Sequence, residues 1–169
     1  PISLIGAADN ALAKGMAEGA LKHPTIRAIL ERPGSGECSV FATIEGVACK
    51  ARFDYLPDVS DQRIVALDLK TAFSAHPAKF TKNAARLDYG VQHGSYLSVL
   101  NAALGPMPRG MEPELLFAVI DKRPPHFASL IGLPDVWVQR AKEKTARALR
   151  IIRDCEESGI WPDYGTGIH

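Results

Sequence analysis

The spacing of apolar positions changes several times along the chain, and each change marks a predicted element. Apolar residues at helical spacing predict one or two helices in the first thirty residues, interrupted at His23-Pro24 because the residue before a proline leaves the helical region. Segments 39–45 and 47–56, separated by Gly46, predict a β-hairpin. Residues 63–70 are apolar almost to their end, which is typical of a buried third strand.

The second half of the chain alternates in the same way. Residues 83–104 predict one long helix that ends at Gly105, residues 115–122 and 127–131 predict two strands, and a last helix runs from Pro134 to about residue 158. The predicted order is helix, three strands, helix, two strands, helix. We therefore expect an α/β fold with a mixed β-sheet flanked by helices, in a single domain over residues 1–169.

Composition limits the class of protein. A length of 169 residues with 46% hydrophobic content allows one good core, and no apolar run approaches the roughly 20 residues of a membrane span. We expect a soluble, cytoplasmic protein without a membrane segment. The three cysteines lack close pairing, which argues against a disulfide framework and a zinc knuckle.

The net charge of +1 is low for a protein that binds nucleic acid, but the basic residues are concentrated. Segment 137–153 holds six of them against one acid, Glu143, and a smaller basic group lies at Lys79, Lys82 and Arg86. The basic residues of the last helix are either its solvated face or a guide for DNA.

Candidate chemistry lies on the predicted hairpin of residues 47–70. Asp54 comes near the end of one strand and Asp68 near the end of the next, so the turn between them brings the two acids together. Residues two apart share a face of a strand, which places Lys70 beside Asp68 and predicts that Leu69 points into the core. Two carboxylates suit Mg²⁺, and a nearby lysine can orient water or stabilise charge on a phosphate. An acid two positions before a lysine is also common as a surface pair.

A stripe of two tyrosines and a glutamine follows on the 83–104 helix. Tyr89, Gln92 and Tyr96 stand at i, i+3 and i+7 and therefore share one helix face beside the Asp68 strand. Such a stripe is usually core packing, but a buried glutamine amide needs hydrogen-bond partners.

These segments carry a family resemblance. Residues 49–54, 64–71 and 89–96 resemble the three core motifs of the PDDEXK nucleases of the RecB-like branch, which have a restriction-endonuclease-like core. Within that branch the chain is most similar to the exonuclease VIII (RecE) nuclease domains, and the similarity runs from about residue 10 to residues 161–164. Phe53 stands where the motif has proline, and Asp68 stands where it has glutamate.

The resemblance implies roles for individual residues. Asp54, Asp68 and the carbonyl of Leu69 would bind Mg²⁺, with Mn²⁺ as an alternative, and Lys70 would serve the attacking water. Gln92 and Tyr96 would brace the site or contact the DNA backbone. The implied catalytic residues are therefore Asp54, Asp68, Lys70, Gln92 and Tyr96.

The resemblance also implies a substrate and partners. Such nucleases digest linear double-stranded DNA from the 5′ end, form closed rings of four subunits and act in phage-type recombination. We therefore expect a homo-oligomer in a bacterial host or prophage setting, with a single-strand-annealing recombination protein as a further partner.

One family feature has no counterpart in this sequence. The family carries a metal-binding histidine on a helix upstream of the first aspartate, whereas His23 matches a non-catalytic position. Since the chain starts at Pro1 and not at a methionine, we expect that an upstream helical segment is missing. Two further candidates are Glu37, as a third acid, and His93, as a residue facing DNA. The alternative functions are a site- or structure-specific endonuclease and a catalytically silent DNA-binding or assembly module.

Overall fold

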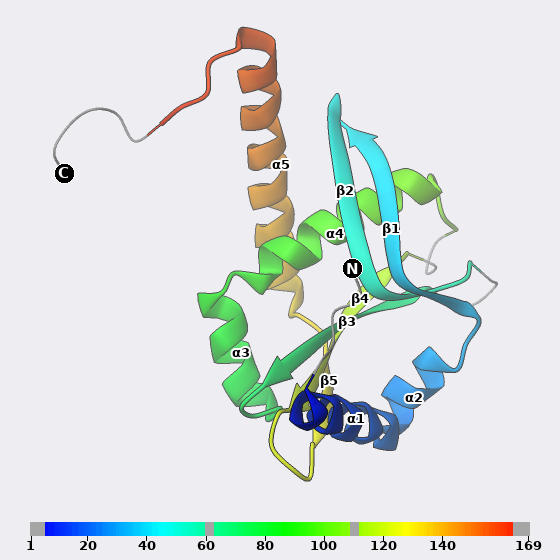
Figure 1. Ribbon diagram of the computed structural model, residues 1–169. Coiled ribbons are helices and arrows are strands. Elements are labelled where there is room, and N and C mark those ends of the chain that lie inside the picture. The colour runs from blue at the N-terminus through cyan, green and yellow to red at the C-terminus, as the bar shows by residue number, and fades with distance from the viewer. Residues whose placement is uncertain (1–5, 60–62, 109–111, 164–169) are drawn as a thin grey trace, which may run out of the picture.

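The computed structural model describes residues 6–59, 63–108 and 112–163, and its centre is a five-stranded mixed sheet with strand order β1-β2-β3-β4-β5 (Figure 1). Neighbouring strands are antiparallel except β3 and β4, which are parallel. The strands are β1 (Gly34–Ile44), β2 (Val47–Pro57), β3 (Val65–Ala72), β4 (Glu114–Asp121) and β5 (Ala128–Ile131). The helices are α1 (Ala7–Lys22), α2 (Pro24–Leu30), α3 (Pro77–Arg86), α4 (Tyr89–Leu104) and α5 (Asp135–Ser158). The predicted α/β class with a helix-flanked mixed sheet is confirmed.

The two faces of the sheet bury different helices because side chains alternate along each strand. One face packs against α4 and α3, through clusters that include Ala66 of β3 and Phe117 of β4. The other face packs against α1 and α2, where Leu67 and Ala118 meet Ile26. Asp68 and Lys70 therefore lie on the α4 face, in register with Ala66.

The expected single helix over residues 83–104 is wrong, because this segment belongs to two helices. α3 starts at Pro77, with the His76 ring accepting a hydrogen bond from the backbone N–H of Ala78 at 3.3 Å. The chain then breaks at Asp88, which adopts the left-handed conformation with φ 54°. The break turns α4 onto the sheet and brings Tyr89 to its first position.

The expectation that Leu69 points into the core is also wrong, since this side chain is 43% exposed. The alternation along β3 was predicted correctly, but the face that carries Asp68 is the more deeply buried one at this point. Asp68 itself is only 3% exposed. On the Leu69 face, α1 lies mainly over β4 and β5, and so leaves this part of β3 open.

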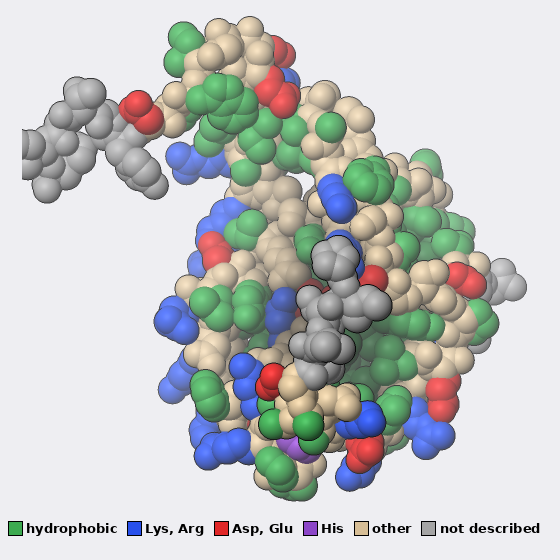
Figure 2. Space-filling model, viewed as in Figure 1, with side chains coloured by type: hydrophobic (Ala, Val, Ile, Leu, Met, Phe, Trp, Pro, Cys, Tyr) green, Lys and Arg blue, Asp and Glu red, His purple; other side chains and the backbone are tan. Residues whose placement is uncertain are grey.

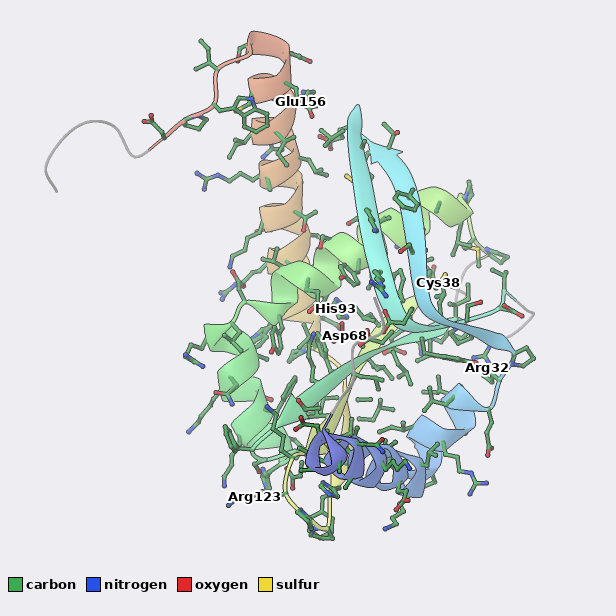
Figure 3. The ribbon with its side chains drawn as sticks, in the orientation of Figure 1. Arg32, Cys38, Asp68, His93, Arg123 and Glu156 are labelled. Atoms are coloured by element: carbon green, nitrogen blue, oxygen red, sulfur yellow. The ribbon has the colours of Figure 1, made fainter. Side chains whose placement is uncertain are left out.

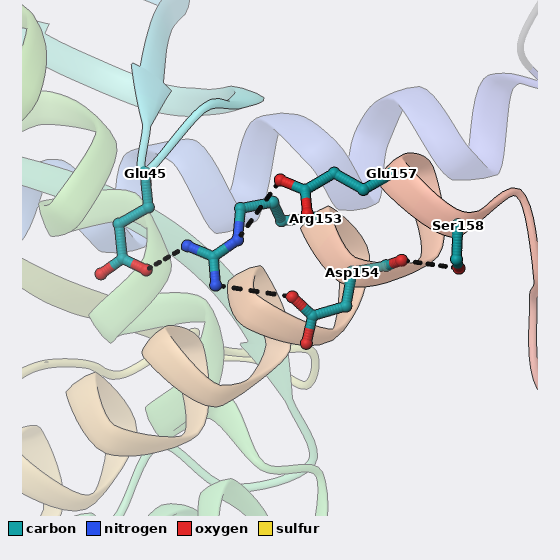
Figure 4. A network of polar contacts seen from close by, with 5 residues as sticks. All are labelled: Glu45, Arg153, Asp154, Glu157 and Ser158. Atoms are coloured by element: carbon teal, nitrogen blue, oxygen red, sulfur yellow. Dashed lines mark hydrogen bonds and ion pairs between the residues drawn. The ribbon is translucent and has the colours of Figure 1, made fainter.

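α5 packs across α4 and extends past it toward the tip of the β1–β2 hairpin (Figure 1). A Cβ at Gly94 of α4 would lie 2.8 Å from the Cβ of Ala141, so the two helices meet at small residues. Near its end, α5 contacts the hairpin turn through Arg153, whose guanidinium lies 4.0 Å from Glu45 (Figure 4). Within the described ranges, none of the helices is long and apolar enough to cross a membrane.

Candidate active site

The two acids of the hairpin meet where β2 runs beside β3. The strands pair at Tyr55 and Leu67, next to the acids in sequence. The backbone N–H of Leu69 donates a hydrogen bond of 2.5 Å to Oδ2 of Asp54, which ties this carboxylate to β3. The charge of Asp54 contributes to the raised pKa of Asp68, as expected for two carboxylates in one site.

Asp68 lies in the interior, between β3 and α4 (Figure 3). Its Oδ1 accepts a hydrogen bond of 2.5 Å from Nε2 of Gln92, and its Oδ2 lies 2.6 Å from the ammonium of Lys70. Burial raises the pKa of the Asp68 carboxyl, the charge of Asp54 acts in the same direction, and Lys70 and Gln92 oppose them. Each oxygen of the Asp68 carboxylate thus has one partner, the Gln92 amide for Oδ1 and the Lys70 ammonium for Oδ2.

The Lys70 ammonium is held from several sides. It donates a hydrogen bond of 3.0 Å to Oε1 of Gln92, so the Gln92 amide bridges the Asp68 carboxylate and the Lys70 ammonium. The ring of Tyr89 lies 4.8 Å from Nζ, and the ring of Phe117 lies 5.8 Å away. Two aromatic rings thus lie beside the Lys70 ammonium, in addition to Asp68 and Gln92.

The residues of the predicted stripe on α4 contact two different parts of the site. Tyr89 and Gln92 contact Lys70 directly, whereas Tyr96 packs edge-on against Phe53 with ring centroids 5.3 Å apart. Phe53 precedes Asp54 on β2, so Tyr96 supports the strand that carries the first acid. In the described structure no contact joins Tyr96 to Asp68 or Lys70.

Glu37 lies on strand β1 beside β2, although its sequence indicated a loop. On β1 it lies between Gly36 and Cys38, which pair with Tyr55 and Phe53 of β2, so it stands across from Asp54. Its carboxylate is exposed and forms an ion pair of 2.5 Å with Arg52. Glu37 therefore faces solvent at the edge of the site.

His93 was a candidate for contact with DNA, and its burial excludes it from that role. The side chain is 4% exposed, and its Nε2 lies 3.1 Å from the carbonyl oxygen of Leu115. Burial lowers the pKa of His93, with a smaller contribution in the same direction from the charge of Lys142. His93 is a core residue that links α4 to β4.

Sequence reasoning missed Phe117, which forms one wall of the Lys70 environment. Phe117 is fully buried on β4 and pairs in register with Asp68 across the parallel β3–β4 ladder. The only sequence signal was an apolar strand, since nothing local shows which strand it joins. Among the described residues, no group of three or more His, Cys, Asp and Glu side chains is placed to hold a metal ion. A metal here would have two protein carboxylates as its side-chain ligands.

Solved structures include relatives of this fold. A protein from Eubacterium rectale, described as "Putative exonuclease", shares 15% identity with a TM-score of 0.66, and the match covers 92% of this chain. It covers 57% of that protein, so this chain spans little more than half its length. A structure named SSO0001 matches with 15% identity over 84% of this chain and 67% of that one. Its TM-score of 0.38 is too low to inform the fold.

A search of curated proteins found no significant match. A family model, described as a PDDEXK-like domain of unknown function (DUF3799), matches residues 5–168, which is nearly the whole chain. This match confirms the predicted PDDEXK core, while the closer similarity to exonuclease VIII stays a prediction. The Asp54, Asp68 and Lys70 hairpin is thus found in a chain that belongs to the PDDEXK-like family DUF3799.

Proposed function

We propose that this chain is the nuclease domain of a metal-dependent deoxyribonuclease that hydrolyses phosphodiester bonds of DNA. The observation that carries the proposal is the network of Asp68, Gln92 and Lys70, in which a buried carboxylate and an ammonium share one amide. Burying such charges costs free energy that their attraction often fails to recover, and perturbed acids of this kind cluster at functional sites. The PDDEXK-like family and the fold of the Eubacterium rectale protein agree with the proposal.

Asp54, Asp68 and the carbonyl oxygen of Leu69 would hold the metal ion. The donors fit a hard divalent cation, because all of them are oxygens, and Asp68 Oδ2, which lies 2.6 Å from the Lys70 ammonium, is the oxygen of this carboxylate that Gln92 leaves open. We propose Mg²⁺, with Mn²⁺ as the alternative. When bound, such an ion polarises a phosphate oxygen and lowers the pKa of water.

The other side chains act on the substrate or on one another. The Lys70 ammonium, fixed by Gln92 and the Tyr89 ring, would stabilise the charge that grows on the phosphate and orient the attacking water. Gln92 keeps the acid and the lysine at a fixed separation. Tyr96 acts indirectly, by supporting the strand of Asp54 through Phe53.

The proposal extends to the mode of digestion. By its similarity to exonuclease VIII, the protein would degrade linear double-stranded DNA from 5′ to 3′ in phage-type recombination within the cytoplasm. It would act as a homo-oligomer, a tetramer by analogy, together with a single-strand-annealing protein. These finer statements rest on the resemblance alone.

A digestion assay tests the function. Linear and circular duplexes are incubated with wild type, Asp68→Ala and Lys70→Ala, each with Mg²⁺ and with chelator. The matched controls are Asp9→Ala and Lys14→Ala, which remove the same charges from exposed positions on α1. We expect degradation of linear DNA that needs Mg²⁺, is lost in both site variants and is kept in both controls.

Each other result has a defined meaning. Undiminished degradation by Asp68→Ala contradicts the proposal. Cleavage of circular DNA at internal positions replaces the exonuclease with an endonuclease. DNA binding without cleavage by the intact protein identifies a silent DNA-binding module.

A further inference from the structure

A pocket of about 290 Å³ lies between the α3–α4 turn and α5. The buried small residues Ala84 and Ala141 line it, and the exposed cations Arg140 and Lys144 of α5 line it as well. Gly90, a further lining residue, directly follows Tyr89, whose ring holds Lys70. The pocket therefore adjoins the first turn of the helix that carries the candidate site.

Exposed cations extend from the pocket in two directions. On α5, Arg140, Lys144 and Arg147 stand at i, i+4 and i+7 and therefore share one helix face. On α3, the exposed Lys79, Lys82 and Arg86 follow the same rule at i, i+3 and i+7. Lysine and arginine side chains follow one another down the side of the molecule formed by α5 and α3 (Figure 2). We name these six residues the α3–α5 cationic surface.

Two other basic residues of α5 are engaged elsewhere. Arg153 lies within 4.0 Å of Glu45, Asp154 and Glu157, which neutralise it (Figure 4). Lys142 lines a different cavity, beside His93. Arg150 is exposed as well, and the basic residues of α5 that line the pocket are Arg140 and Lys144.

We propose that the α3–α5 cationic surface binds the phosphate backbone of the DNA substrate, with one phosphate seated in the pocket between Arg140 and Lys144. The proposal rests on the nuclease function proposed above. From Arg140 to Arg147, α5 rises about 10 Å, and one DNA strand presents about three phosphates over that length. A row of three cations over that length suits a nucleic-acid backbone better than a single small anion.

Asp88 opposes this binding. It lines the same pocket, and its Oδ2 lies 2.6 Å from the ammonium of Lys144, with both side chains more than half exposed. A phosphate in the pocket competes with Asp88 for Lys144. Asp88 adopts the left-handed conformation, which asparagine also tolerates, so Asp88→Asn removes the competing charge while the turn is kept.

The test is equilibrium binding of a fluorescent linear duplex in chelator, where no cleavage interferes, across a series of salt concentrations. The paired variant Arg140→Ala with Lys144→Ala should bind roughly tenfold more weakly and lower the slope of log K against log salt by about 0.9, since the one phosphate seated between the two cations is lost. The matched control pair, Lys14→Ala with Lys22→Ala, removes two exposed cations from α1 on the opposite face of the sheet. Its slope should stay as in wild type.

A second variant should change DNA affinity in the opposite direction. Asp88→Asn should bind the duplex severalfold more tightly than wild type, and more tightly than the control Asp9→Asn on α1. Melting curves are recorded for all variants to check that each one is folded. An unchanged slope in the Arg140 and Lys144 pair, an equal loss in the α1 control pair, or no gain in Asp88→Asn relative to Asp9→Asn overturns the proposal.

The binding measurement also separates this proposal from the proposed function. If the protein cleaves DNA but the Arg140 and Lys144 substitutions leave DNA binding unchanged, the proposed binding surface is wrong and the nuclease function is retained. If it binds through this surface yet never cleaves, the surface stands and the nuclease is wrong.

Discussion

The ammonium of Lys70 lies 4.8 Å from the centroid of the Tyr89 ring, so the end of β3 and the first residue of α4 are joined by a cation–π contact. The lysine side chain is 20% exposed, and in such partly desolvated surroundings the contact stabilises by up to about 2 kcal/mol. Phe117 lies near the same ammonium, and Asp68 and Gln92 bind it, so four side chains limit where the Lys70 ammonium can lie. The aromatic pair therefore orients the proposed catalytic lysine.

Tyr89→Leu should lower kcat about tenfold with little change in KM, because it removes the ring that orients Lys70 without touching the DNA-binding cations. Tyr89→Phe keeps the ring face and should retain most of the rate. Steady-state digestion of linear duplex measures both parameters.

A double-mutant cycle gives the decisive control for Tyr89. If the ring acts through Lys70, then Tyr89→Leu should cost nothing further in a Lys70→Ala background. A full additive loss in that background, or a loss in Tyr89→Phe as large as in Tyr89→Leu, contradicts the positioning role.

Gln92→Met should lower the free energy of unfolding by about 1–3 kcal/mol, because it leaves Asp68 Oδ1 and the Lys70 ammonium without their shared amide while side-chain volume is kept. Urea denaturation in chelator measures this value. Gln139→Met, at an exposed position of α5, is the matched control and should change the free energy little. Equal effects of the two substitutions would show that the amide bridge is energetically unimportant.

The hairpin and its acids could be predicted from sequence because their signals are local. Alternating apolar residues and Gly46 indicate β1 and β2, and an apolar run that ends in Asp68 and Lys70 indicates β3. Since a strand has a period of two, the shared face of Asp68 and Lys70 followed directly. For Gln92, the sequence predicted only that a buried amide needs hydrogen-bond partners. In the structure these partners are Asp68 and Lys70.

The features that sequence reasoning missed depend on tertiary context. Asp88 in the left-handed conformation separates α3 from α4, and neither glycine nor proline marks this position. Leu69 is exposed because α1 crosses the neighbouring strands, which no property of β3 reveals. Phe117 reaches Lys70 only through the parallel pairing of β3 with β4, two elements separated in the chain by α3 and α4.

Thermal stability should fall as the pH falls below about 6.5, because burial lowers the pKa of His93 in the folded protein below the ordinary value of 6.5. In that range the unfolded chain binds a proton that the folded chain does not, so protonation favours unfolding. Above pH 6.5 neither state binds this proton, and the contribution of His93 to stability is constant.

Melting curves between about pH 5 and pH 8 test this dependence. His93→Gln, which can still donate to the Leu115 carbonyl, should melt with a weaker pH dependence than wild type. His76→Asn is the control, since His76 is exposed and asparagine can also cap α3. An identical pH profile in wild type and His93→Gln would exclude His93 as the cause.

Two glycines on α4 should respond oppositely to the same substitution. A Cβ at Gly90 would lie 3.8 Å from the Cβ of Ala141, an ordinary contact, so Gly90→Ala should stabilise the fold by up to about 1 kcal/mol through helix propensity. At Gly94 the new Cβ would lie 2.8 Å from that Cβ and 3.0 Å from the Ala141 carbonyl carbon, so α5 must move away. Gly94→Ala should therefore destabilise despite the same gain in propensity, typically by about 1–3 kcal/mol. Urea denaturation compares them, and Ala141→Gly should relieve part of the Gly94→Ala loss. Equal stabilisation by both alanines would mean that α4 and α5 do not approach as closely as the structure has them.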